Sequence, residues 1–326
     1  MPPMNRTIGL LLVLAAALLP ATALGQTPAP APAPAPVQTQ MAIALERVGG
    51  KRATVLKGST VRVRGTIGAF VAGESVVVRA ASSGRRVLAR RVAIQPGPGG
   101  TGSFAVSLRA TRVGRLVVRA AHDATPALAA LTAPGRGVDV LPRSVGPRSA
   151  PASVRMLQRR LRRLGYVVGA RGRFDARTAR AVLAFRKVTG MARTSAASLP
   201  VMRAIARGRG AFRVRFPNHG RHIEADLSRQ VIALVSRGRV ERILPVSSGA
   251  PSTPTVIGSF RVYLKTPGRN SLGMVHSAYF IRGYATHGYA SVPVYPASHG
   301  CLRVPIPEAL SLFRWIRIGT RVDVYR

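Results

Sequence analysis

One short segment of the chain, THGYASVPVYPASHGCLRVP (286–305), concentrates residues able to do nucleophilic chemistry. It holds the only cysteine of the 326 residues, Cys301, and two of the six histidines, His287 and His299. A thiolate attacks carbonyl carbon, and a nearby imidazole promotes this by accepting the thiol proton or by pairing as an imidazolium. His299 lies two residues before Cys301, which in a strand puts both side chains on one face. The segment predicts a cysteine nucleophile whose pKa is lowered by a histidine.

The neighbouring residues fit acyl transfer at that cysteine. Gly300 allows close approach of a substrate and leaves amide N–H groups to face an oxyanion. No Asp or Glu occurs between Glu241 and Glu308, so a backbone carbonyl has to orient the base, and that of Gly288 is the local choice. Arg303 can hold a substrate carboxylate by paired hydrogen bonds. We therefore expect an anionic substrate.

Two other interpretations of the cysteine remain open at this point. His287, His299 and Cys301 could supply three ligands to a zinc ion with an open water position. Catalytic zinc sites usually include carboxylates, and the segment has none. The thiol could also be buried and inert. We expect neither a metal ion nor an organic cofactor.

The first 25 residues have the pattern of a signal peptide. Arg6 supplies positive charge, residues 8–19 are an apolar run, and the small residues ATALG follow. An uncleaved anchor is the alternative, although the run is shorter than the ~20 residues that span a bilayer. No later stretch is long enough to cross a membrane. We expect export to the periplasm or cell wall, where a cysteine without an intrachain partner indicates a reactive thiol.

The chain is strongly basic, with 50 Lys and Arg against 10 Asp and Glu, a net charge of +40. Such a field attracts polyanions. Nucleic acid is not the expected partner, because exported proteins meet little of it and aromatic residues for base stacking make up only 5%. Anionic cell-surface polymers or lipid headgroups fit the expected compartment better.

Composition divides the rest of the chain into several parts, as its length predicts. Residues 26–40 alternate Pro and Ala and should form an extended linker. Residues 41–142 contain short β-like runs at regular spacing, typical of an antiparallel sandwich or barrel with an accessory role. A second linker is expected at 143–152. Residues 211–326 are predicted to be mostly β, with strands near 222–227, 230–236, 239–248, 259–265 and 321–325 and a helix from Pro307 to about Arg317.

Between these β-rich parts, residues 153–208 have helical periodicity. Ser153 is the predicted N-cap of a first helix, and Asp175 that of a second, which ends near Gly190. A third helix is expected at about 198–207. The order of Leu-Gln-x-x-Leu, Leu-Gly-Tyr, Gly-x-Phe-Asp and Ala-Val-x-x-Phe resembles the three-helix peptidoglycan-binding domain of many wall enzymes. The usual Gln after the motif Phe is Arg186 here, and a packing module without a ligand remains the alternative.

The cysteine segment resembles the YkuD-type L,D-transpeptidase catalytic domain. The resemblance rests on HG, a loop and SHGCLR, and on the upstream VSSGAPSTPTVIGSFRVY. Together with the patterns of the other parts, it predicts a multidomain α+β protein, with a β-sandwich-like part, a helical wall-binding part and a mostly β catalytic part. It also implies these roles: Cys301 as nucleophile, His287 as general base, and Gly288 orienting that base through its carbonyl. His299, Gly300 and the Cys301 amide would form the oxyanion hole, and Arg303, Ser298, Tyr279 and Met274 would bind substrate.

The resemblance implies peptidoglycan stem peptides and glycan strands as partners. Cys301 would attack a tetrapeptide stem, expel D-alanine and pass the acyl group to the side-chain amine of another stem, giving a 3→3 cross-link. An L,D-carboxypeptidase, with water as acceptor, and a wall-binding scaffold without activity are the alternatives. The sequence leaves the oligomeric state open.

Overall fold

The structure is a computed structural model that describes residues 34–49 and 53–326. The predicted signal peptide (1–25) and most of the predicted Pro/Ala linker (26–40) lie outside these residues. Residues 36–326 form one compact unit. None of the helices within the described residues has the length and apolarity needed to cross a membrane.

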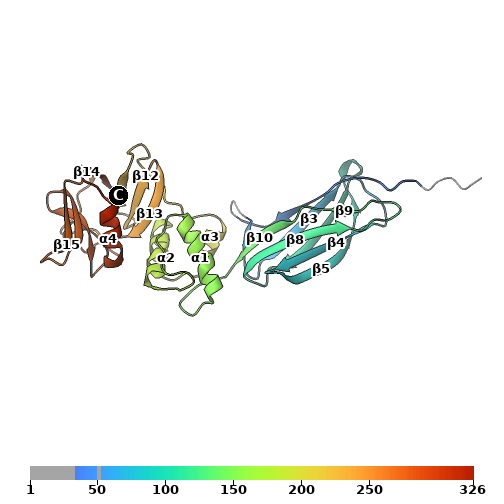
Figure 1. Ribbon diagram of the computed structural model, residues 1–326, viewed down its shortest axis with the longest axis horizontal. Helices are drawn as coiled ribbons and strands as arrows, with labels where there is room; N and C mark the ends of the chain where they lie inside the picture. Colours follow the sequence, from blue (N-terminus) through green and yellow to red (C-terminus); the bar gives the residue numbers. More distant parts are fainter. Residues whose placement is uncertain (1–33, 50–52) are drawn as a thin grey trace, which may run out of the picture. The chain divides into compact units, whose positions relative to one another are not determined.

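The N-terminal part consists of two sheets that share one core (Figure 1). The first sheet contains, in spatial order, β1 (Met41–Glu46), β3 (Thr60–Ile67), β7 (Gly102–Arg109) and β6 (Gln95–Pro96). The second contains β2 (Thr54–Leu56), β10 (Arg136–Leu141), β8 (Gly114–His122), β4 (Ser75–Ser82) and β5 (Arg85–Ala93), with β9 (Leu131–Thr132) paired to β8. Along β3, Val61 and Val63 are fully buried whereas Arg64 is exposed. This alternation of period two is what one buried sheet face requires.

Three helices follow: α1 (Pro151–Arg163), α2 (Ala176–Val188) and α3 (Leu199–Ala206). The predicted cap of α2 is present, because the Asp175 carboxylate accepts a hydrogen bond from the Thr178 amide at 2.8 Å. The predicted cap of α1 is wrong. This helix begins at Pro151, whose fixed φ suits a first helical position, and Ser153 lies inside it.

The polar motif residues of the helical part are turned inward. The Gln158 amide group donates to the carbonyls of Ala170 (2.8 Å) and Arg173 (3.0 Å), which fixes the loop between α1 and α2. Arg186, which stands where the family has Gln, is buried and donates to the carbonyl of Ala192 at 2.6 Å. These side chains hold loops in place, so a ligand must meet other residues of this part.

The C-terminal part has two further sheets and one helix. The first sheet has the order β13 (Arg239–Pro245), β12 (Val231–Ser236), β11 (His222–Asp226), β19 (Arg321–Tyr325) and β14 (Gly258–Arg261). The second has the order β15 (Leu264–Arg269), β16 (Val275–Ile281), β17 (Tyr284–Tyr289) and β18 (Leu302–Pro305). Helix α4 (Ile306–Trp315) lies in the position predicted for a helix and packs against β16 and β17. The predicted multidomain α+β architecture is confirmed.

A buried lysine joins the helical part to the β12–β13 sheet. The Lys187 amine of α2 is 3% exposed and donates to the carbonyls of Gln230 and Val246, each at 3.0 Å. Burial, reinforced by the charge of Arg193, lowers the pKa of Lys187 to about 7. A neutral amine still has two N–H groups, so both hydrogen bonds persist after it loses its proton.

This lysine predicts a pH-dependent stability. Between pH 7 and about pH 10 the unfolded chain holds the Lys187 proton and the folded chain does not, so folding is favoured as pH rises. The free energy of unfolding of the native chain should therefore increase over this range relative to that of Lys187→Met. Denaturant titrations at several pH values measure the difference. The exposed Lys57→Met is the control, and a pH dependence equal in the two variants would contradict the assignment.

Candidate active site

The register of β17 and β18 brings the predicted nucleophile and base together. The two strands are parallel, with His287 opposite Arg303 and Thr286 opposite Leu302. Since side chains alternate along a strand, His287 and Arg303 share one face, and Thr286 and Leu302 the other, which is buried. Cys301 lies two residues before Arg303, and its Sγ accepts a hydrogen bond from the Ala285 amide at 3.4 Å. Cys301 directly precedes β18, and this hydrogen bond places its sulfur beside the β17 backbone, two residues from His287.

The His287 ring is held in one tautomer by its own strand. Its Nδ1 is 2.9 Å from the Gly288 carbonyl oxygen, which can only accept, so Nδ1 carries the proton and Nε2 has the lone pair. The ring is 2% exposed. Burial lowers the pKa of His287, the hydrogen bond to Gly288 opposes this, and the charge of Arg303 adds to the lowering. The imidazole is therefore neutral and available as a base.

The resting state of the thiol differs from the expectation. Burial raises the pKa of Cys301, and the Ala285 amide and the charge of Arg303 offset this only in part. We expected a pKa lowered by an imidazolium, but burial of both groups favours their uncharged forms. A thiol in this form has to give up its proton to a base before or during an attack on a substrate.

A tight turn positions Cys301. The buried Ser298 hydroxyl donates to the Cys301 carbonyl at 2.6 Å and accepts from the Gly300 amide at 3.1 Å. Gly300 has φ +108°, and a Cβ there would lie 1.9 Å from the Tyr284 ring. Only glycine fits this position, because the left-handed backbone and the aromatic ring both exclude a side chain.

This turn corrects three expectations. Residues 299–301 form a bend, and His299 is exposed, so His299 and Cys301 do not share a strand face. Ser298 is 1% exposed and its hydroxyl is used within the turn, so it positions Cys301 and has no surface for a substrate. The Gly300 amide is also bound, whereas the amides of His299 and Cys301 have no acceptor among the described residues. The free donors are therefore those two amides.

Sequence reasoning did not single out the threonines that fix this turn. The Thr255 hydroxyl, which is buried, donates to the Gly300 carbonyl at 2.7 Å and accepts from the Gly249 amide at 2.9 Å. The Thr253 hydroxyl donates to the Ser298 carbonyl at 2.9 Å. Both threonines belong to the upstream stretch VSSGAPSTPTVIGSFRVY, which carried the resemblance without an assigned role. This stretch holds the carbonyls of the cysteine turn.

The three residues predicted to bind substrate that remain, Arg303, Tyr279 and Met274, lie in or next to the β15–β18 sheet. The Arg303 guanidinium lies over the Tyr289 ring at 4.2 Å and donates to the Ala297 carbonyl at 3.1 Å. Tyr279 pairs with Ala285 across β16 and β17, so its side chain lies on the same sheet face as those of Ala285 and His287. Met274 lies just before β16 and is buried, with its amide donating to the Asn270 side chain at 2.9 Å.

Gly288 has a second reason to be glycine. A Cβ there would lie 2.6 Å from the Ala309 Cβ in α4, so the absence of a side chain lets the helix pack against β17.

The part of the chain that the structure describes contains no group of three His, Cys, Asp or Glu side chains able to hold a metal ion.

Comparison with known proteins agrees with this geometry. Residues 220–324 match the model of the L,D-transpeptidase catalytic domain, and residues 151–198 match that of a putative peptidoglycan-binding domain. The L,D-transpeptidase from Xylanimonas cellulosilytica has 33% sequence identity, with 56% of this chain and 98% of that chain covered and a TM-score of 0.51. This chain belongs to the L,D-transpeptidase family.

Other solved L,D-transpeptidases are more distant. That of Enterococcus faecium has 26% identity over 32% of this chain and 50% of that chain, with a TM-score of 0.29. One from Mycobacterium tuberculosis has 13% identity over 87% of this chain and 98% of that chain, with a TM-score of 0.30. Comparison with curated proteins gives no match.

The threonine contact of this L,D-transpeptidase predicts a specific defect. Thr255→Val leaves the Gly300 carbonyl and the Gly249 amide without their buried partner, which costs about 1–3 kcal/mol of stability. Displacement of the turn should also lower kcat by about 100-fold, since an error of about 1 Å is sufficient for that. Thr255→Ser keeps the hydroxyl and should retain most activity. Equal kcat values for the two variants would contradict the positioning role.

Proposed function

We propose that this protein is a cysteine L,D-transpeptidase that forms 3→3 cross-links in peptidoglycan through a thioester on Cys301. The observation that carries the proposal is the hydrogen bond from His287 Nδ1 to the Gly288 carbonyl, on the strand whose Ala285 amide binds the Cys301 sulfur. It leaves Nε2 as a base on the face that presents the thiol. Membership of the L,D-transpeptidase family supports the same reaction class.

The first half-reaction transfers an acyl group to sulfur. His287 Nε2 takes the Cys301 proton as Sγ attacks the carbonyl carbon of the third residue of a tetrapeptide stem. The oxyanion that forms accepts hydrogen bonds from the free amides of His299 and Cys301. When the amide bond breaks, the imidazolium gives its proton to the departing nitrogen, and D-alanine leaves. The thioester keeps the acyl group activated.

The second half-reaction consumes the thioester. The side-chain amine of a second stem attacks the acyl carbon, His287 Nε2 takes a proton from that nitrogen, and Cys301 leaves as a thiol after the proton returns to sulfur. A new amide bond replaces the one that was broken, so no nucleotide is needed. With water as the attacking group, the same steps give a carboxypeptidase.

The surroundings of the site favour a substrate with carboxylates. Arg303 presents a guanidinium on the face of Cys301, held by Tyr289 and Ala297. We assign it to the donor stem, with Tyr279 and Met274 as candidates for the walls of the donor pocket. We place the reaction in the periplasm or cell wall, as the predicted signal peptide implies, with the helical part bound to peptidoglycan strands.

The cysteine predicts the outcome of a simple substitution. Cys301→Ala should abolish product formation from disaccharide tetrapeptides, because no other thiol is present. Mass spectrometry of the native reaction should show cross-linked dimers and released D-alanine, and a transient acyl adduct on the protein. Tripeptides alone would assign a carboxypeptidase. Product formation by Cys301→Ala would refute covalent catalysis at this residue, and no product from the native protein would favour a scaffold.

The protonation states predict the pH profile. A neutral pair reacts only when His287 is unprotonated and Cys301 is protonated. Since burial lowers the pKa of His287 and raises that of Cys301, kcat/KM should stay level over a wide range. It should fall on the acid side below the pKa of an ordinary histidine, and on the alkaline side above that of an ordinary cysteine. With a resting thiolate–imidazolium pair, by contrast, the rate at which a thiol reagent alkylates Cys301 would not depend on pH near neutrality. Alkylation rates measured against pH therefore distinguish the neutral pair from the ion pair.

A further inference from the structure

The helical part offers solvent a surface made largely of arginine. Its polar motif residues Gln158, Thr178 and Arg186 are buried and used in loop contacts. Along α1, by contrast, exposed arginines recur at positions 155, 159, 162 and 163, and Arg171 follows in the next loop. We call these five residues the arginine face. Among the described residues, none forms a hydrogen bond or a salt bridge with the guanidinium group of any of these five arginines.

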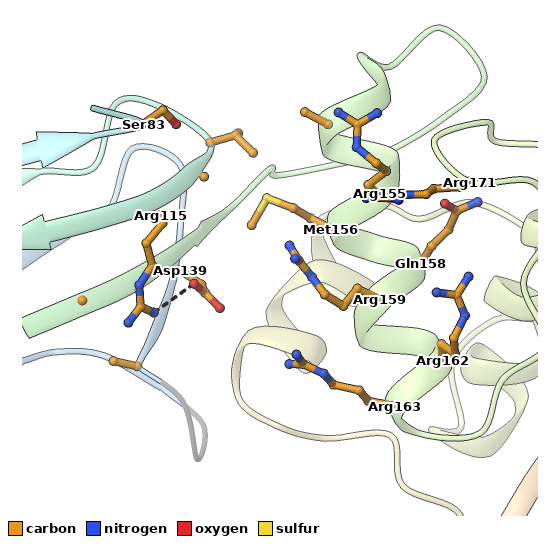
Figure 2. A pocket seen from close by; sticks show the side chains of 15 residues that line it. Ser83, Arg115, Asp139, Arg155, Met156, Gln158, Arg159, Arg162, Arg163 and Arg171 are labelled. Atoms are coloured by element: carbon orange, nitrogen blue, oxygen red, sulfur yellow. Dashed lines mark hydrogen bonds and ion pairs between the residues drawn. The ribbon is translucent and has the colours of Figure 1, made fainter. Parts of the chain in front are cut away.

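The arginine face is continuous because of its helical spacing. Residues three, four and eight apart lie on one side of a helix, and the rise of 1.5 Å per residue spreads Arg155 to Arg163 over about 12 Å. Arg155, Arg159, Arg162 and Arg163 are seen along one helix in Figure 2, with Arg171 beside it. Together they line a cavity of about 870 Å³. The arginine face therefore borders a cavity that a linear polymer can enter.

Nothing within this cavity neutralises the row. Among the described residues that line it, Asp139 alone is acidic, and its carboxylate is already bound by Arg115 at 3.1 Å and Arg160 at 2.8 Å. The five guanidinium groups repel one another without a counter-charge, which is unfavourable unless an anionic ligand supplies it. A neutral glycan could not do so. A polymer with several oxyanions in a line would complement this charge.

We propose that the arginine face binds a linear phosphate-bearing polymer, apart from the peptide substrate of Cys301. A guanidinium forms paired hydrogen bonds with a phosphate, and a phosphodiester or polyphosphate chain carries its charges in its backbone. Such a chain can follow a row about 12 Å long within a cavity. A lipid bilayer presents phosphates on a broad surface and cannot enter this hollow. The site would retain the enzyme on an anionic polymer while the catalytic part works on stem peptides.

Binding of labelled linear polyphosphate to the full-length protein tests this proposal. Fluorescence anisotropy over a series of salt concentrations gives the slope of log K against log[salt], which is about −0.7 per phosphate contact on a single chain. The triple variant R155Q/R159Q/R162Q should weaken binding and reduce this slope by about two. The matched control R203Q/R207Q/R209Q removes the same charge from exposed arginines at and after α3 in the same part of the chain. It should leave the slope nearly unchanged.

Each other outcome overturns the proposal. Equal slopes in the two triple variants would show that only total charge matters. Polyglutamate of equal length binding as tightly would exclude recognition of phosphate, and anionic phosphatidylglycerol vesicles binding in place of polyphosphate would assign a membrane surface. Thermal melting of each variant shows whether it is folded, and the single variant Arg159→Gln, with an expected slope change of about 0.7, replaces the triple variant if that does not fold.

Discussion

The active site depends on one hydrogen bond, from the Nδ1 proton of His287 to the carbonyl of its neighbour Gly288. Many histidine bases are oriented by a carboxylate, but this segment has no acidic residue. A carbonyl fixes the tautomer without placing a second charge in the buried sheet. It also gives the imidazolium less support than a carboxylate would, which agrees with the lowered pKa of His287. Burial therefore favours the uncharged form of both His287 and Cys301.

An oriented imidazole can act on the thiol only if the turn that holds Cys301 is also fixed. Hydroxyl groups fix this turn. Ser298 binds the Cys301 carbonyl, and Thr255 binds that of Gly300. These contacts satisfy both carbonyl groups, while the amides of His299 and Cys301 have no acceptor among the described residues. Gly300 permits the left-handed backbone and the contact with Tyr284. Backbone geometry thus explains the Ser298 and Gly300 positions of this segment.

The sequence predicted features that depend on local pattern. Alternation along β3 identified the sandwich, Asp175 identified the start of α2, and the lack of nearby acids identified the Gly288 carbonyl as the partner of His287. The strands β16, β17 and β18 were not predicted, because VHSAYFI, YATHGY and LRVP lack a regular alternation of apolar residues. The exposure of His299 and the raised pKa of Cys301 depend on burial by distant segments. No local pattern contains that information.

Contacts between the helical part and the catalytic sheets extend to the cysteine turn. Lys187 and Arg193 donate to the carbonyls of Val246 and Val294, the latter at 2.9 Å. Two residues after Val246, the Ser248 carbonyl accepts the amides of Ala297 and Ser298 at 2.8 and 2.9 Å. A continuous path of hydrogen bonds and covalent links therefore connects α2 and the loop after it to the turn that holds Cys301. Since one apolar core includes Val182 and Phe185 of α2 together with Val231 and Ile243 of the sheet, the two parts cannot separate without exposing it. The helical part is consequently a structural support of the active site, whatever ligand it binds.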